Sequence, residues 1–306
     1  MPSKSQSSVS LAVTSFAVAA AAAALETALR RPLTGMLRVP PERAEAARGL
    51  NRSSAMLAAA ALADSAVEHY RGSFHNRTMV LPLAIAAQAL GSGLHGALDK
   101  RHRFSAARDL GNAASLFTGI AGTGFHFYNI LKRPGGWSWL NLFYAAPIGA
   151  PAALSLAGLL GGIAERLRGG GSAAIYGFPP GRLIGRLVAL GLLGTSGEAG
   201  LMHFRGAYHN PAMLIPVTAP PVAAALLAGA TICRRLTGPA RWSMRLLTAI
   251  GLVGAGFHAY GVQRSMGGWR NWSQNLLNGP PLPAPPAFTA LAIAGLAALK
   301  LIERER

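Results

Sequence analysis

The sequence predicts an all-α, polytopic membrane protein, built from two tandem four-helix repeats that follow one extra amino-terminal helix. Three observations carry this prediction: long apolar segments, an uneven distribution of basic residues between them, and a motif that occurs twice. Of the 306 residues, 51% are apolar and only 13% are charged, about half the charged fraction of an average soluble domain. The apolar content excludes a disordered chain, and the single Cys233 excludes a disulfide scaffold.

Nine segments are long and apolar enough to cross a bilayer, which requires about 20 residues each. The first, 8–28, is followed by Arg30 and Arg31, and this order of flanks favours a retained helix over a cleaved signal peptide. The other predicted spans are 53–70, 79–98, 110–131, 150–165, 186–203, 212–233, 244–263 and 287–302. The lipid bilayer is therefore the expected surrounding of the chain.

The net charge of +18 indicates how the chain sits in the membrane. Of the 29 Lys and Arg residues, 21 fall in one alternate set of connecting segments and 8 in the other. Basic residues concentrate on the cytoplasmic side of membrane proteins, so the richer set is predicted to be cytoplasmic, and the chain is placed in the inner (cytoplasmic) membrane. The basic residues form short clusters between apolar runs instead of one patch, so no nucleic-acid partner is expected.

One motif recurs at an offset of 134 residues: His69-Tyr-Arg-Gly-Ser-Phe-His-Asn76 returns as His203-Phe-Arg-Gly-Ala-Tyr-His-Asn210. A second pair, around His126 and His258, recurs at an offset of 132. Because each copy holds an even number of predicted helices, both copies have the same orientation and are parallel repeats. The predicted organisation is an amino-terminal helix with a basic segment over 1–47, repeats over 48–168 and 182–306, and a Gly/Pro-rich linker over 169–181.

Six of the eight histidines belong to these recurring segments, all near the predicted outer ends of the helices. Asp64, Glu68 and Glu198 precede the motif within apolar helices, where a carboxylate needs a partner or water. If the helix continues past Tyr70, Arg71 and His75 lie within about 20° of the direction of Asp64 on the helix surface. Each copy is thus predicted to hold its own cluster of acid, arginine and histidine on the outer side.

Imidazole and carboxylate groups are ligands for transition metals, and two histidines on neighbouring helices can hold a haem. The candidate cofactor ligands are His69, His75, His126, His203, His209 and His258, joined in a metal site by Asp64 and Glu198. The residues expected to support these ligands are Glu68, Arg71, Asn76, Arg205 and Asn210. Asn76 and Asn210 are also placed to cap the helix that follows each of them.

The leading functional hypothesis is a membrane protein with an outer-side site for haem or a transition metal, acting as membrane partner of a periplasmic redox enzyme. One alternative is a solute transporter or channel with a polar site at the interface of the repeats. Another is a structural or assembly protein in which the polar residues only hold helices together. No HExxH, CxxC or CxxCH motif selects among these hypotheses, and no catalytic residue is identified.

Overall fold

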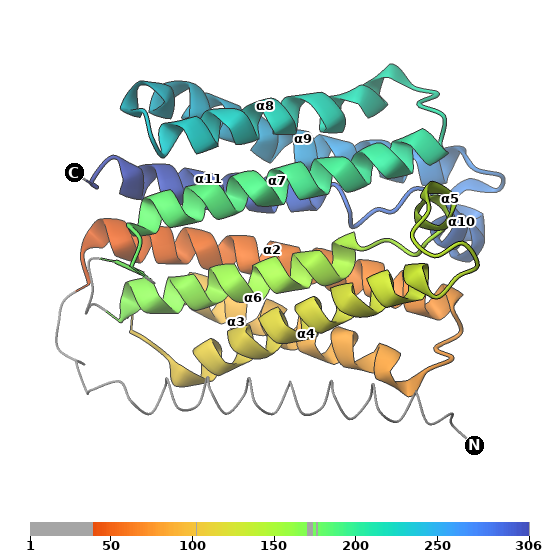
Figure 1. Cartoon of the computed structure of the whole chain (residues 1–306), viewed down its shortest axis with the longest axis horizontal. Coiled ribbons are helices and arrows are strands. Elements are labelled where there is room, and N and C mark those ends of the chain that lie inside the picture. The colour runs from red at the N-terminus through yellow and green to blue at the C-terminus, as the bar shows by residue number, and fades with distance from the viewer. Residues whose placement is uncertain (1–38, 102, 170–173, 176, 306) are drawn as a thin grey trace.

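The computed structural model describes residues 39–101, 103–169, 174–175 and 177–305. The predicted first helix, 8–28, lies outside the described residues. Within them the chain folds into helices and no β-strand, which confirms the all-α prediction (Figure 1). Four segments are long and apolar enough to cross a membrane, and they indicate a membrane protein: Arg77–Leu98, Pro180–Arg205, Pro211–Ala230 and Arg234–Arg264.

Each of the other eight predicted spans overlaps a long helix. These helices are α2 (Pro41–Arg71), α3 (Leu81–Leu98), α4 (Ala106–Leu131), α6 (Gly149–Arg168), α7 (Pro180–Arg205), α8 (Ile215–Ala230), α9 (Thr237–Arg264) and α11 (Pro286–Ile302). Helices α2, α7 and α9 begin well before the predicted start. The short helices are η1 (Arg77–Val80), α5 (Trp139–Phe143), η2 (Pro211–Leu214), η3 (Arg234–Leu236), η4 (Gly268–Asn271) and α10 (Trp272–Asn278). Helix α2 begins at Pro41, with Pro in its first turn and Ala44, Ala46 and Ala47 buried, so the predicted domain boundary at residue 47 falls inside a helix.

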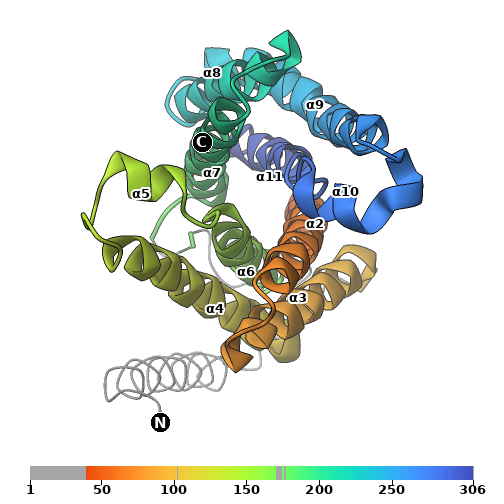
Figure 2. The same cartoon turned by 90° about the vertical axis from the view of Figure 1, so that its right-hand side faces the viewer.

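The long helices form two groups that meet along α2 and α11. In the first half α6 packs against α2 and α4, and in the second half α11 packs against α7 and α9. Figure 2 looks along the helices and shows α2, α6, α7 and α11 in the middle, with α3 and α4 on one side and α8 and α9 on the other. The histidine end, with residues 69–80, 132–148, 203–214 and 265–285, is opposite the arginine end, with residues 99–101, 103–105, 231–236 and 303–305.

Small residues let these helices approach one another closely. A Cβ atom added to Gly119 on α4 would lie 2.4 Å from Ser155 Oγ on α6. A Cβ added to Gly251 on α9 would lie 2.3 Å from Thr289 Oγ1 on α11. Helix pairs with such contacts gain van der Waals packing without large side chains, as is common in membrane proteins.

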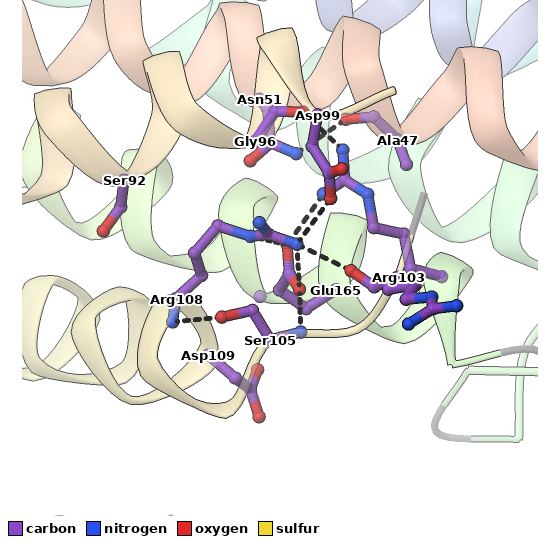
Figure 3. A network of polar contacts seen from close by, with 12 residues as sticks. Ala47, Asn51, Ser92, Gly96, Asp99, Arg103, Ser105, Arg108, Asp109 and Glu165 are labelled. Carbon is purple, nitrogen blue, oxygen red and sulfur yellow. Dashed lines mark hydrogen bonds and ion pairs between the residues drawn. The ribbon is translucent and has the colours of Figure 1, made fainter. Parts of the chain in front are cut away.

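A buried ion-pair network holds the first half together at the arginine end (Figure 3). Glu165 on α6 is fully buried, and its carboxylate accepts hydrogen bonds from Arg108 Nε at 2.8 Å and from Arg168 Nη1 at 2.7 Å. The backbone N–H of Ser105 donates to the same carboxylate at 2.8 Å. Asp99 contributes a second carboxylate, 3.3 Å from Arg108 Nη2. Burial of a carboxylate at this depth requires such partners.

The second half has no such network at the matching positions. At the offsets of 134 and 132 residues, Glu165, Arg168 and Arg108 correspond to Leu299, Ile302 and Ala240. All three of these apolar side chains are buried. The same place in the two halves is therefore filled once by charges and once by hydrocarbon.

Candidate functional site

Both copies of the recurring motif end a helix with the same tight turn. In the first copy Ser73 and Phe74 have positive φ angles of 56° and 44°, and the Phe74 N–H donates to His69 O at 3.0 Å. In the second copy Ala207 and Tyr208 have φ angles of 56° and 45°. Two consecutive non-glycine residues in the left-handed region are uncommon, so this turn is a specific feature of the motif.

The turn separates the residues that the sequence places on one helix face. Helix α2 ends at Arg71, and His75 lies beyond the turn, where its Nδ1 is 3.1 Å from Gly72 O and its ring is exposed. The expected face shared by Asp64, Arg71 and His75 is therefore not formed, because the helix stops before His75. His209 repeats this arrangement, with Nδ1 3.0 Å from Gly206 O.

Asn76 and Asn210 cap the short helices that follow the turn, as the sequence predicts. The side-chain oxygen of Asn76 accepts a hydrogen bond from the Thr78 N–H at 3.0 Å. The oxygen of Asn210 accepts one from the Ala212 N–H at 2.9 Å. Each asparagine thus satisfies a free donor at a helix start and is used for local structure.

The first histidine of each motif is anchored to the backbone. His69 Nδ1 lies 2.7 Å from Met79 O, and His203 Nδ1 lies 3.0 Å from Met213 O. A carbonyl oxygen only accepts hydrogen bonds, so Nδ1 carries the proton and Nε2 of the neutral ring is left with a free lone pair. The contact fixes both the tautomer and the orientation of these two rings.

The histidines of α4 and α9 stand beside these anchored rings. His258 Nδ1 lies 2.7 Å from Pro281 O, and the ring centroids of His258 and His203 are 6.4 Å apart at an interplanar angle of 74°. In the first half His126 lies near both His69 and the backbone of Pro147. His126 Nδ1 is buried and makes no hydrogen bond within the described part of the chain.

The two acids at matching positions of α2 and α7 have different partners. Glu198 Oε1 accepts a hydrogen bond from the backbone N–H of Gly149 at 2.8 Å. Gly149 is the first residue of α6, where the backbone N–H groups have no partner inside the helix. Asp64 receives no hydrogen bond from any described residue, and the charges of Glu68, Glu198 and Arg71 act on it.

The arginines of the motif also differ. Arg71 Nη1 donates to Glu68 Oε1 at 2.7 Å in a partly exposed ion pair. Arg205 is tied to the segment around α5, because Nη2 donates to Leu142 O at 3.1 Å and to Ala145 O at 3.2 Å. The Arg205 guanidinium also lies 5.5 Å from the centre of the Phe143 ring.

One large cavity at the histidine end, between the two halves, connects many of these residues. Its volume is about 2730 Å³, and α2, α6, α7, α9 and α11 all contribute to its walls. The predicted site residues that line it are Asp64, Glu68, Arg71, Glu198, His203, Arg205, His209, Asn210 and His258. His69, His75, Asn76 and His126 are not among its lining residues. The acids of both halves thus face one shared space, although the sequence predicts a separate cluster in each repeat.

The expected metal site is not formed. In the part of the chain that the structure describes, no three His, Cys, Asp or Glu side chains come together as ligands of one metal ion. This applies to the predicted set Asp64, His69, His75 and His126 and to the set Glu198, His203, His209 and His258. The reason is geometric: the tight turn directs His75 and His209 away, and Glu198 is bonded to the start of α6.

The sequence does not predict the ion-pair network at the arginine end. Its only signal is the coincidence of acids and arginines near the ends of α4 and α6, because the partners Arg108 and Glu165 are 57 residues apart.

No protein-family model, no curated protein and no solved structure matches this chain. The function assigned to the chain therefore rests on the geometry of its own residues.

Proposed function

We propose that the chain is a multi-pass membrane protein that binds a solute in the cleft between its two halves and carries it across the membrane. One observation carries this proposal: Asp64 and Glu198, at matching positions of different halves, line one cavity of about 2730 Å³. Carboxylates inside transmembrane helices commonly mark substrate or ion pathways. Transporters built from repeats bind their substrates at the interface between those repeats.

The proposed topology has about nine spans, with the histidine end outside and the arginine end in the cytoplasm. The distribution of 21 and 8 basic residues supports this orientation. The proposal treats the two halves as parallel repeats. Support comes from the equal turn angles at Ser73 and Ala207 and from the matching contacts of His69 and His203 with backbone carbonyls.

The arginine end of the interface between the halves is tightly packed. A Cβ added to Gly49 on α2 would lie 3.1 Å from Ala297 Cβ on α11. Lys300 Nζ pairs with Glu45 Oε2 across the same two helices at 2.9 Å. A cleft at one end and close packing at the other correspond to one of the two states between which a transporter alternates.

Cysteine labelling tests the cleft. In a Cys233→Ser background, Gly194→Cys and Gly197→Cys place thiols on the cavity wall, where an added Cβ meets nothing within 4 Å. Ala58→Cys on α2 is the matched control, since Ala58 is fully buried. A membrane-impermeant maleimide added from outside should label the first two positions and leave the control unlabelled. Absence of labelling at both cavity positions would contradict the proposed cleft.

A second candidate function, a haem site, is favoured by one specific observation. The rings of His203 and His258 lie edge to face with their centroids 6.4 Å apart, and both Nδ1 atoms contact backbone carbonyls. Histidines that bind metals commonly donate their other nitrogen in this way, so both Nε2 atoms are available as axial ligands of a haem iron. If the chain binds haem here, we propose that it is the membrane partner of a periplasmic redox enzyme.

The visible spectrum of the purified protein tests this candidate. A Soret band that disappears in His203→Ala and His258→Ala, but persists in the exposed matched control His209→Ala, supports a haem between the two rings. A folded sample with no Soret band excludes this candidate and leaves the proposed solute cleft in place.

A further inference from the structure

We propose that the solute of the cleft is an organic cation with an apolar body and that Asp64 is its anionic anchor. This inference rests on the proposed solute-binding function and adds the chemical class of the solute. Among the described residues, three acids line the cavity. Glu68 is paired with Arg71 and Glu198 is bonded to the start of α6, so only Asp64 of the three is free to meet a ligand.

Glu198 is occupied by the protein itself. Its Oε1 accepts the Gly149 N–H at 2.8 Å, and a Cβ atom added to Gly149 would lie only 1.7 Å from its Oε2. Both carboxylate oxygens are thus close to the first residue of α6. The positive end of the helix dipole adds to this attraction, so Glu198 serves as a link between α7 and α6.

Asp64 lacks the equivalent partner. The position that corresponds to Gly149, 134 residues further on, is Pro283. Proline has no backbone N–H to donate, and an aspartate side chain is one methylene shorter than a glutamate. Among the described residues, nothing donates a hydrogen bond to Asp64, although the side chain lines the cavity.

The nearby arginines do not replace this partner. Arg71 lies within electrostatic range of Asp64, but its hydrogen bond goes to Glu68 at 2.7 Å. Arg205 donates to backbone carbonyls around α5. Arg264, also on the cavity wall, lies over the Tyr260 ring at 5.8 Å. Among the described residues, Asp64 is therefore the lining carboxylate that has no hydrogen-bonded partner.

The remaining cavity wall suits an organic cation better than a bare metal ion. Aromatic rings line it, among them Trp139, Phe143, Phe204 and Phe257. The faces of such rings attract cations, and Phe143 already holds the Arg205 guanidinium at 5.5 Å. A metal ion would need several converging ligands, and the described residues provide no group of three. A positive charge on an apolar body matches both the carboxylate and the rings.

Two probes of the same shape and opposite charge test the inference. Tetraphenylphosphonium and tetraphenylborate are offered to the full-length protein in lipid nanodiscs, and saturable binding is measured by equilibrium dialysis. We expect the cation to bind and the anion not to bind. Asp64→Asn should raise the Kd of the cation at least about tenfold, as the loss of a partly buried charge contact does. Glu42→Gln, which changes an acid outside the cavity lining, is the matched control and should leave the Kd unchanged.

A second measurement keeps the test decisive if Asp64→Asn does not fold. Saturating tetraphenylphosphonium should protect Gly194→Cys from maleimide, and the shorter neutral variant Asp64→Ser should remove that protection. Binding of the anion alone would overturn the cationic class of the solute. Equal cation binding by the wild type and the Asp64 variants would overturn the role of Asp64 as the anchor. Either result leaves the cleft intact. If neither probe binds while Gly194→Cys is labelled, the inference fails and the proposed function stands. If labelling also fails, the proposed function falls with it.

Discussion

Glu198 on α7 accepts a hydrogen bond at 2.8 Å from the backbone N–H of Gly149, the residue with which α6 begins. The two residues belong to different halves of the molecule, so this bond joins the halves at the histidine end. It also explains why the residue at 149 is a glycine, since any side chain would collide with the carboxylate.

Gly149→Ala should destabilise the protein by about 1–3 kcal/mol, because the new methyl group displaces Glu198 and leaves helix N–H groups unsatisfied. Thermal unfolding in detergent provides the measurement. Gly194→Ala is the matched control, because its Cβ would meet nothing within 4 Å. Equal melting temperatures for the two variants would contradict the role given to Glu198.

Glu165→Leu should cost about 3–5 kcal/mol, because it leaves the buried guanidinium groups of Arg108 and Arg168 without their carboxylate. The triple variant Glu165→Leu, Arg108→Ala, Arg168→Ile copies the residues found at the matching positions of the second half. Replacement of a complete buried ion pair by apolar residues is often neutral, so the triple variant should recover most of the loss. A triple variant no more stable than the single one would show that the two halves are packed differently here.

Asp99, which follows α3, should make the stability depend on pH. Burial by itself raises the pKa of this carboxyl, but the Arg101 N–H and the charges of Arg108 and Arg168 outweigh it, so the pKa lies below its ordinary value of 3.8. A pKa that is lower in the folded chain stabilises the fold above the unfolded value, and this contribution disappears as the pH falls through the folded value.

The melting temperature of the wild type should therefore exceed that of Asp99→Asn by a constant amount above about pH 5, and the gap should shrink below about pH 4. Thermal unfolding of both proteins, recorded over this pH range, measures the gap in melting temperature. A gap that persists unchanged in acid would show that Asp99 contributes through packing and not through its charge.

Asn76→Ala and Asn210→Ala should each destabilise the protein by about 1 kcal/mol, the usual effect of removing a helix cap. The effects should be equal, because the two side chains accept bonds of 3.0 Å and 2.9 Å from matching N–H groups. The sum of the two losses in unfolding free energy should equal the loss in the double variant, measured by chemical unfolding. A large effect at one position alone would mean that the two copies of the motif play different structural roles.

Much of the local structure follows from the sequence. Uninterrupted apolar length predicts where the helices run, and the asparagine at the end of each motif predicts a cap. Both features depend on residues that are close together along the chain. The same pattern does not reveal the two left-handed residues, Ser73 and Phe74, because neither is a glycine, and this turn removes His75 from the expected face of α2.

The sequence by itself determined the all-helical class, the approximate places of the long helices among the described residues and the residues that recur in both copies. Only the tertiary structure decided which of those residues meet. Glu198 and Gly149 are 49 residues apart, and Arg108 and Glu165 are 57 apart, so their contacts depend on how whole helices pack. The packing also gives the two matching acids, Asp64 and Glu198, different roles. The N–H of Gly149 bonds to Glu198. The position that corresponds to Gly149 in the second half is Pro283, which has no N–H to offer Asp64.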